Sequence, residues 1–252
     1  MASRESYTPG YTEPTLRLML KRTAASHAAF FTPRLHRGMR VLDCGCGPGT
    51  ITVDLAKLVF PGQVFGIDLE PTQVRSAQHL SREQQLGVLF GVASIYALPF
   101  ADGQFDAIFS HALFEHLQEP VKALLEIKRV LRSSGLVGIR SPDWAALLIY
   151  PPCPLLEQAF HRFKQIQIAN GGNPYVGRTL KGLLREAGFS KISISASYEI
   201  FDDLPTFLDW LTSCLESRGH AELKQNAQEV CAWSEHPDAL VAVAWFEGLG
   251  AA

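Results

Sequence analysis

A doubly wound α/β fold is predicted by three observations on the amino-acid sequence. Residues 41–50, Val-Leu-Asp-Cys-Gly-Cys-Gly-Pro-Gly-Thr, join an apolar strand to a glycine-rich turn. The run that follows, residues 51–58, has the apolar spacing of a helix, so the turn opens onto a helix N-terminus. Strand-like and helix-like segments then alternate along the chain, which favours a parallel sheet with helices on both faces. Strand, glycine turn and helix in this order are typical of the nucleotide-binding start of such folds.

Each predicted element has a local signal in the sequence. Short apolar or alternating runs predict the strands, and amphipathic spacing predicts the helices. Pro71 and Pro120 suit the first turns of two helices. The predicted strands are residues 40–44, 63–67, 88–93, 105–110, 135–140, 191–197 and 240–246. The predicted helices are residues 15–31, 49–59, 71–81, 120–131 and 179–187, followed by a polar helical stretch at 204–234.

The 252 residues are predicted to form a single domain. Residues 1–35 are expected to form an N-terminal arm and a helix, and residues 36–141 the core that carries the glycine turn. Large apolar side chains crowd residues 142–176, which indicates a helical insertion. This insertion and the stretch at 204–234 are expected to form a small helical cap.

Composition and charge exclude several classes of protein. A hydrophobic fraction of 47% is enough for a large core, and a net charge of -2 produces no overall field that attracts nucleic acid or an anionic membrane. Residues 21–40 are locally basic and are interpreted as a solvated helix face and loop. The first residues have no apolar signal-peptide region, and no apolar run approaches the roughly 18 residues of a membrane span. We therefore expect that the protein binds no nucleic acid and does not associate stably with a membrane.

Cysteine usage indicates a reducing compartment. The five cysteines form no paired framework, which predicts a cytoplasmic protein without disulfides. Cys44 and Cys46 lie within and beside the glycine turn, but no second Cys/His pair at ligand spacing accompanies them. Small apolar filler is the favoured role, and no metal site is predicted.

Two acids at strand ends indicate the kind of ligand. Asp43 stands two residues before Gly45, where its carboxylate would repel a pyrophosphate but would attract a ligand with an ammonium group and a sulfonium. Asp68 ends the second strand, where a carboxylate accepts hydrogen bonds from both ribose hydroxyls. Leu69 beside it would supply an apolar contact to adenine. The sequence therefore predicts a site for a positively charged adenosyl ligand.

Four segments together resemble the successive motifs of a known family. VLDCGCGPGT, GIDLE, ALPFADGQFDAIFSHALFEHL and EIKRVLRSSG are similar to those of class I S-adenosylmethionine-dependent methyltransferases, in particular the ubiquinone/menaquinone-type small-molecule enzymes. The match is dense over residues 40–141, and residues 7–11 resemble an N-terminal arm found in part of that group. The resemblance implies a Rossmann-like, seven-stranded, mostly parallel sheet with an antiparallel last strand. It also implies S-adenosylmethionine as the cofactor and a small-molecule acceptor.

The resemblance assigns parts of the cofactor to particular residues. The glycine turn and Asp43 would hold the methionine end, Asp68 the ribose, and Ser110 would contribute its backbone to the methionine moiety. Ser94 and Ile95 would flank the base, although many relatives have Asp where Ser94 stands. The expected cofactor-binding residues are Asp43, Gly45, Cys46, Gly47, Gly49, Asp68, Leu69, Gln73, Ser94, Ile95, Ser110 and Tyr11.

The implied reaction is in-line displacement at a sulfonium methyl group, for which orientation matters most. Alignment of the reactants supplies roughly 7–11 kcal/mol of the barrier, and a general base adds about 10²–10⁴-fold where the acceptor must lose a proton. His111, Glu115 and His116 cluster just past the fourth strand and are the catalytic candidates. His111 or His116 would act as the base, or both are structural histidines. Tyr11 would close over the pocket as a lid, or belong to a surface arm.

Other functions of the same fold fit the motifs less well. A nicotinamide dehydrogenase needs Gly-x-Gly-x-x-Gly/Ala, and Thr50 occupies the last position here. A nucleic-acid base methyltransferase would show Asn/Asp-Pro-Pro-Tyr after the fourth strand, where this chain has Ser110-His-Ala-Leu. A catalytically silent cofactor-binding scaffold or regulator remains the alternative to an enzyme.

The acceptor is expected to bind near the helical insertions. Their aromatic and aliphatic residues favour an apolar or aromatic small molecule, but the same residues also suit packing of the cap or a homodimer interface. The sequence leaves open whether oxygen, nitrogen or carbon is methylated.

Overall fold

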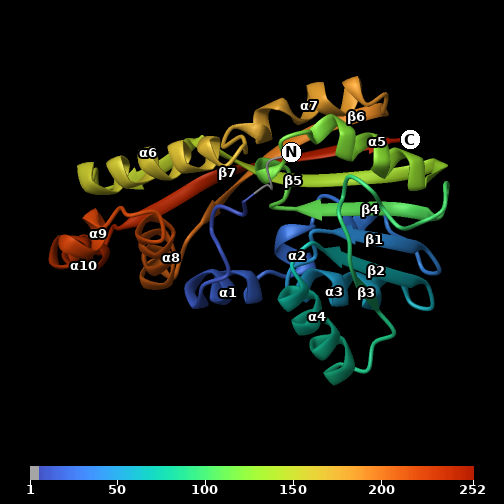
Figure 1. Ribbon diagram of the computed structural model, residues 1–252, viewed down its shortest axis with the longest axis horizontal. Coiled ribbons are helices and arrows are strands. Elements are labelled where there is room, and N and C mark those ends of the chain that lie inside the picture. The colour runs from blue at the N-terminus through green and yellow to red at the C-terminus, as the bar shows by residue number, and fades with distance from the viewer. Residues whose placement is uncertain (1–5) are drawn as a thin grey trace.

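The computed structural model describes residues 6–252, so the first five residues of the predicted arm lie outside the described part of the chain. Seven strands form one sheet with the order β3-β2-β1-β4-β5-β7-β6 (Figure 1). They are β1 (Arg40–Cys44), β2 (Gln63–Asp68), β3 (Leu89–Val92), β4 (Phe105–His111), β5 (Leu131–Tyr150), β6 (Ser190–Ile200) and β7 (Leu240–Ala251). Only β7 runs antiparallel to its neighbours within the described residues. The predicted Rossmann-like fold with an antiparallel last strand is therefore confirmed.

Helices cover both faces of the sheet, as the alternation of segments predicted. Helices α5 and α7 pack on one face of the sheet, whereas α2 and α3 pack on the other. In Figure 1, α7 lies near the top of the view and α4 near the bottom. The helices are α1 (Glu13–Leu20), α2 (Ala24–His27), α3 (Thr50–Val59), α4 (Pro71–Glu83), α5 (Pro120–Val130), α6 (Pro154–Ala169), α7 (Val176–Glu186), α8 (Leu204–Glu216), α9 (Glu222–Gln225) and α10 (Ala227–Ser234). Two short 3₁₀ turns, Thr32–Arg34 and Phe114–His116, complete the set. Pro71 and Pro120 stand in the first turns of α4 and α5, where a missing N–H costs no hydrogen bond.

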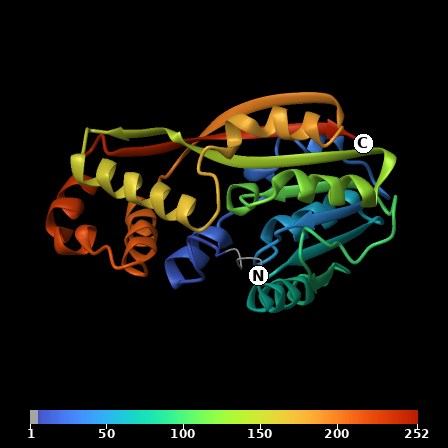
Figure 2. The ribbon, with the colours of Figure 1, turned by 45° about the horizontal axis from the view of Figure 1, so that its top comes forward.

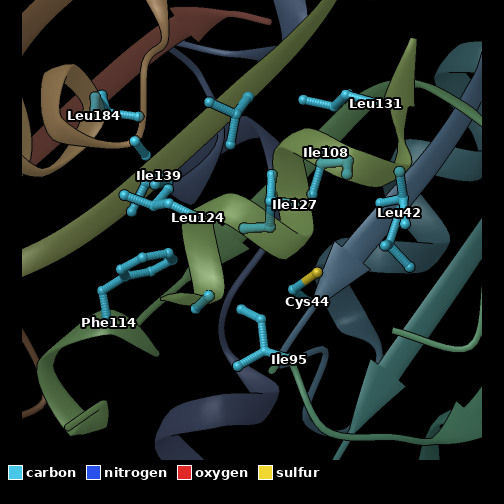
Figure 3. Close-up of a cluster of buried hydrophobic side chains, with 14 of the residues drawn as sticks. Leu42, Cys44, Ile95, Ile108, Phe114, Leu124, Ile127, Leu131, Ile139 and Leu184 are labelled. Carbon is cyan, nitrogen blue, oxygen red and sulfur yellow. The ribbon is translucent and has the colours of Figure 1, made fainter. Parts of the chain in front are cut away.

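Apolar packing holds these layers together on each face of the sheet. On one face, Leu124 and Ile127 of α5 and Leu184 of α7 pack on Ile108 and Ile139 of the central strands (Figure 3). A second cluster on the opposite face joins α2 and α3 to β1 and β4. A third cluster lies away from both and fills the space between α6, α8 and the outer part of β7. Hydrophobic burial on both faces holds the strands in place. A binding site at the strand ends is therefore built on rigid elements.

The strand β5 is much longer than predicted. The expected helical insertion at 142–176 is wrong in its first part, because residues up to Tyr150 continue β5 and pair with β7 as far as Leu240. The register shifts between Asp143 and Leu147, and helix only begins at Pro154. The extended β5–β7 pair reaches beyond the rest of the sheet and carries the helices α6 and α8 to α10 (Figure 2).

The predicted helices at residues 15–31 and 204–234 are each interrupted. The first divides into α1 and α2, because Thr23 takes an extended conformation and its hydroxyl caps α2 by accepting a hydrogen bond from the Ser26 N–H. The second divides into α8, α9 and α10. The expectation of a polar stretch is wrong for α8, whose Phe207, Trp210 and Leu211 are buried in the third cluster.

Candidate active site

A cavity of about 790 Å³ opens at the carboxyl ends of β1, β2 and β4. The strand order reverses between β1 and β4, because β2 and β3 lie on one side of this pair and β5 on the other. Helices that connect the strands therefore leave on opposite faces, and a crevice forms at the reversal point. We call this space the first cavity.

The glycine turn after β1 forms one wall of the first cavity. The Gly45 and Cys46 N–H groups donate to the Ile67 carbonyl of β2, which fixes the turn against the neighbouring strand. Gly47 has a positive φ of 52°, and a Cβ atom there would meet only Met19 Sδ at 3.9 Å, so its backbone faces open space. Bare backbone at this point lets a ligand approach the chain closely.

Asp43 lines the first cavity as a buried acid at the end of β1. Its carboxylate accepts a hydrogen bond from Thr52 Oγ1 of α3 at 2.6 Å. Burial raises the pKa of Asp43 to about 7, although the Thr52 hydrogen bond opposes this shift. A cationic group in the cavity would favour the ionised form, so Asp43 can respond to the charge of a ligand.

Asp68 holds the turn and presents its carboxylate to the same cavity. Its Oδ2 accepts from the Gly47 N–H and its Oδ1 from the Glu70 N–H, each at 2.9 Å. Burial raises the pKa of Asp68, while these two backbone hydrogen bonds counteract the rise. Each carboxylate oxygen keeps lone-pair capacity for a further donor, such as a pair of neighbouring hydroxyl groups.

Apolar side chains border the first cavity beyond Asp68. Leu69 and Val92 line it and expose 59% and 53% of their surface, which is unusual for large aliphatic groups at strand ends. Ile95 and Ser94 close the opposite side, and the Ser94 hydroxyl accepts from the Tyr96 N–H at 3.3 Å. These walls suit a flat apolar ring with a polar edge.

Three of the predicted cofactor-binding residues do not line the cavity. Gly49 packs α3 on α4, since a Cβ atom there would lie 2.8 Å from the Ala77 Cβ. Gln73 is buried in α4, and the Ser110 hydroxyl donates to the Cys44 carbonyl at 3.0 Å and so joins β4 to β1. The other nine predicted residues line the first cavity: Asp43, Gly45, Cys46, Gly47, Asp68, Leu69, Ser94, Ile95 and Tyr11.

The N-terminal arm forms another wall of the first cavity. Tyr11 stacks on Tyr7 with ring centroids 5.0 Å apart, and Tyr7 meets the His116 ring edge-on at 4.7 Å. The arm is tied to distant elements, because Asn170 Nδ2 donates to the Thr8 hydroxyl at 3.0 Å. Its position is thus set by the cap as well as by the sheet.

A second cavity of about 530 Å³ adjoins the first. The residues that line both are Tyr7, Arg22, Ala112 and His116, and we call this shared wall the junction. Aromatic side chains from five elements line the second cavity, among them Trp144, Phe163, Phe207, Trp210 and Trp245. Rings of this kind offer stacking surfaces and edges to a planar apolar molecule.

A buried ion-pair network stabilises one side of the second cavity. Both terminal nitrogens of Arg140 donate to one carboxylate oxygen of Glu199 at 3.2 Å, and the guanidinium lies 4.4 Å from the Trp245 ring centroid. His27 Nε2 lies 3.6 Å from the other Glu199 oxygen. Burial opposes ionisation of Glu199, but His27 and Arg140 outweigh it and lower its pKa to about 2. The charge of Arg140 is therefore matched by a fixed anion.

The three catalytic candidates lie around the junction. His111 and His116 line the first cavity, and Glu115 lines the second. Burial and the charge of Arg22 lower the pKa of both histidines, to about 3 for His116, so both rings are neutral at physiological pH. Burial raises the pKa of Glu115 to about 7. A neutral histidine of such low pKa accepts a proton only weakly.

Arg22 lines both cavities, although the sequence interpretation gave it no place in the site. The basic segment at 21–40 was expected to be a solvated face, but the chain turns between α1 and α2 and the half-buried Arg22 lines both cavities. Among the described residues, its side chain has neither a hydrogen-bond partner nor an ion-pair partner. Only the three-dimensional arrangement of α1, α2 and the strand ends reveals this position.

Neither a metal-binding cluster nor a membrane-spanning helix is present in the described part of the chain. Residues 6–252 contain no cluster of three or more histidine, cysteine or acidic side chains placed to hold a metal ion. No helix in that part of the chain combines the length and hydropathy needed to cross a bilayer.

Comparisons with known proteins agree with this geometry. Residues 35–188 match the sequence profile of the methyltransferase domain family. The chain is 36% identical over 199 residues to an uncharacterised methyltransferase of Schizosaccharomyces pombe, covering 73% of this chain and 69% of that protein. It is 29% identical to an O-methyltransferase of Aspergillus sclerotiorum, covering 79% and 72%.

Solved structures resemble the fold. A putative methyltransferase from Bacillus halodurans superposes with a TM-score of 0.66 at 15% identity, covering 90% of this chain and 98% of that one. The YcgJ protein of Bacillus subtilis superposes with a TM-score of 0.63 at 17% identity, covering 95% and 98%.

Proposed function

The chain belongs to the methyltransferase domain family, and we propose that it transfers the methyl group of S-adenosylmethionine from the first cavity to a small molecule in the second. The observation that carries the proposal is the junction, since two cavities of different character share one wall. The first is lined by bare backbone and acids, and the second by aromatic rings.

The enzyme class agrees with what the sequence motifs predicted. The family match and the relatives named as methyltransferases confirm a methyltransferase dependent on S-adenosylmethionine. A silent scaffold is not favoured. The methylated atom is a separate matter, because the curated relatives include both O-methyltransferases and an N-methyltransferase.

The residues of the first cavity fit the cofactor in our proposal. Asp68 receives the two ribose hydroxyls on its remaining lone pairs, and Leu69 and Ile95 border the adenine. Asp43 and the bare backbone at Gly47 face the methionine end, where the carboxylate balances positive charge. The Ser94 hydroxyl accepts from the Tyr96 N–H and keeps a donor and a second lone pair, so this hydroxyl or the backbone around Ile95 meets the adenine edge.

The chain contributes to the reaction mainly by orientation. When bound, the cofactor would supply a methyl group on a sulfonium, and an acceptor atom in line with the C–S bond would take the methyl carbon as the sulfur leaves as a neutral thioether. The aromatic walls of the second cavity hold the acceptor, and Ala112 at the junction leaves room for close approach. Tyr7 and Tyr11 shield the first cavity from water. Placement of the two reactants supplies most of the rate enhancement.

Incubation with methyl-labelled S-adenosylmethionine tests the proposed function. Panels of phenols, amines and quinones, and then a metabolite extract, are examined for products heavier by one methyl group. We expect a product among planar aromatic compounds. Tight cofactor binding without transfer to any compound would contradict the proposal and favour the scaffold.

A further inference from the structure

Arg22 differs from the other cations of the second cavity because it makes no direct ion pair or hydrogen bond among the described residues, although Glu115 and Glu199 interact with its charge through space. Arg140 is paired with Glu199, and Lys21 with Asp203. Arg22 lies at the junction without an ion-pair or hydrogen-bond partner among the described residues. A half-buried cation in this position attracts an anion, since burial penalises a charge that no direct ion pair balances.

The position of the junction also indicates which part of a bound molecule would carry the anion beside Arg22. Methyl transfer requires the acceptor atom to meet the cofactor where the two cavities join. Arg22 lines both cavities there, so a reacting group at the junction lies within reach of its charge. The aromatic walls behind the junction, Trp144, Trp210 and Trp245, suit a ring that carries this group.

Resting on the proposed function, we propose that the second cavity binds an aromatic acceptor with an acidic hydroxyl, and that Arg22 holds its oxyanion at the junction. The hydroxyl proton leaves to solvent before transfer. An oxygen lone pair then forms the new O–C bond to the methyl group, while the C–S bond breaks and its electron pair stays on sulfur. Arg22 remains charged throughout and acts by positioning and stabilising the oxyanion.

The surrounding groups support this route over a histidine base. His116 at the junction has a pKa of about 3, lowered by burial and by Arg22, so it is a poor proton acceptor. His111 packs against His27 and Trp245, and burial lowers its pKa well below its usual value. An efficient general base has a pKa near the working pH, so His111 is a poor candidate. An acceptor that arrives as an anion needs neither ring.

The charge that an acceptor meets depends on all charged and titratable groups that face the second cavity. The lining groups are Tyr7, Lys21, Arg22, His27, Glu115, His116, Arg140, Tyr198, Glu199, Asp202 and Asp203, and the His111 ring contacts that of His27. Glu199 and Asp203 are matched by Arg140 and Lys21, and Glu115 is half protonated near pH 7 because burial raises its pKa to that value. Asp202 is exposed, so solvent screens its charge. Arg22 is the cation of the junction that no direct ion pair holds, and it favours ionisation of the acceptor.

The test uses 4-nitrophenol, whose phenolate absorbs visible light and whose neutral form does not. The full-length protein is saturated with S-adenosylhomocysteine, and the pKa of the bound phenol is measured by spectroscopic titration. A nearby opposite charge lowers an acid's pKa by about 1–3 units, so we expect a reduction of at least about one unit in the wild type. Arg22→Gln should abolish the reduction, and Arg22→Lys should retain part of it.

Lys21→Gln is the matched control, because Lys21 is the neighbouring cation and is already paired with Asp203. It should leave the bound phenol's pKa unchanged. The inference is overturned if the wild type binds no 4-nitrophenol, or if Arg22→Gln keeps the wild-type pKa of the probe.

Calorimetry with S-adenosylhomocysteine separates this inference from the proposed function. If Arg22→Gln lowers the affinity for S-adenosylhomocysteine at least tenfold but leaves the phenol's pKa unchanged, Arg22 binds the cofactor's carboxylate and the inference is wrong. If the wild type binds no S-adenosylhomocysteine, the proposed function itself fails.

Discussion

At the residue scale, two acids of the first cavity differ in what holds them. Among the described residues, Asp43 accepts a side-chain hydrogen bond from Thr52 and burial raises its pKa to about 7, whereas Asp68 accepts hydrogen bonds from two backbone N–H groups. In the proposed function, the first acid responds to the charge of the cofactor, and the second offers its oriented lone pairs to the ribose hydroxyls. The two positions therefore make different predictions.

Replacement of Asp68 by Asn should lower the affinity for S-adenosylhomocysteine by about 10- to 100-fold. The variant loses charge-assisted hydrogen bonds to the ribose, each worth about 1.5–3 kcal/mol. Calorimetry measures the change, with Asp102→Asn as a control because Asp102 is exposed and lies outside both cavities. Equal affinity in the Asp68 variant would remove this residue from the ribose role.

Cofactor affinity should rise as the pH increases through about 7. Asp43 is protonated below that value in the free protein, and the ligand's ammonium group binds better to the ionised carboxylate. Thr52→Val removes a hydrogen bond that favours ionisation, so the midpoint should move to higher pH. Calorimetric titrations with S-adenosylhomocysteine across this range measure the midpoint, and a pH-independent affinity would contradict the assignment.

The two junction histidines should contribute little as bases. Their low pKa values, caused by burial and Arg22, predict that His111→Gln and His116→Gln each reduce kcat by less than about tenfold at saturating cofactor. Turnover is measured on the best acceptor from the panel. A loss of 10²-fold or more in either variant would identify that histidine as the general base.

At the element scale, the glycine turn combines a packing position with a position that faces the first cavity, two residues apart. Gly49 allows α3 to pack against Ala77 of α4, whereas Gly47 faces the first cavity. A side chain at the two positions thus meets different surroundings. The distinction is invisible in the sequence, where both glycines belong to one motif.

Gly49→Ala should lower the free energy of unfolding by about 1–3 kcal/mol more than Gly47→Ala does. Its Cβ would lie 2.8 Å from that of Ala77, which forces α3 and α4 apart. Gly47→Ala should instead lower the affinity for S-adenosylhomocysteine. Urea denaturation and calorimetry on both variants test the pair, and an equal loss of stability would show that packing does not distinguish them.

The elements also show why some of the fold was predictable. The turn at Gly45 to Gly49 and the acid at Asp68 carry their signals within a few residues, so β1, β2 and α3 were predicted almost to their ends. Residues 142–150 pair with β7, which lies some 90 residues farther along the chain. Their apolar side chains suit a strand or a helix equally well, and only that distant partner decides between them.

At the scale of the whole molecule, the β5–β7 extension places a helical cap beside the cofactor crevice. Trp144 of β5, Phe163 of α6 and Trp210 of α8 meet there, although they are far apart in sequence. Arg22 joins them through the turn between α1 and α2. Sequence motifs predicted most of the residues that line the first cavity because those motifs are local, whereas the second cavity depends on contacts among four separate segments.

Binding of S-adenosylhomocysteine to the first cavity is the most direct test of the account. Calorimetry on the wild type should show one molecule bound per chain, and a crystal structure of the complex should show its ribose on Asp68 and its amino group near Asp43. A protein that binds none, or a complex with the ligand elsewhere and the first cavity filled by side chains, would contradict the account.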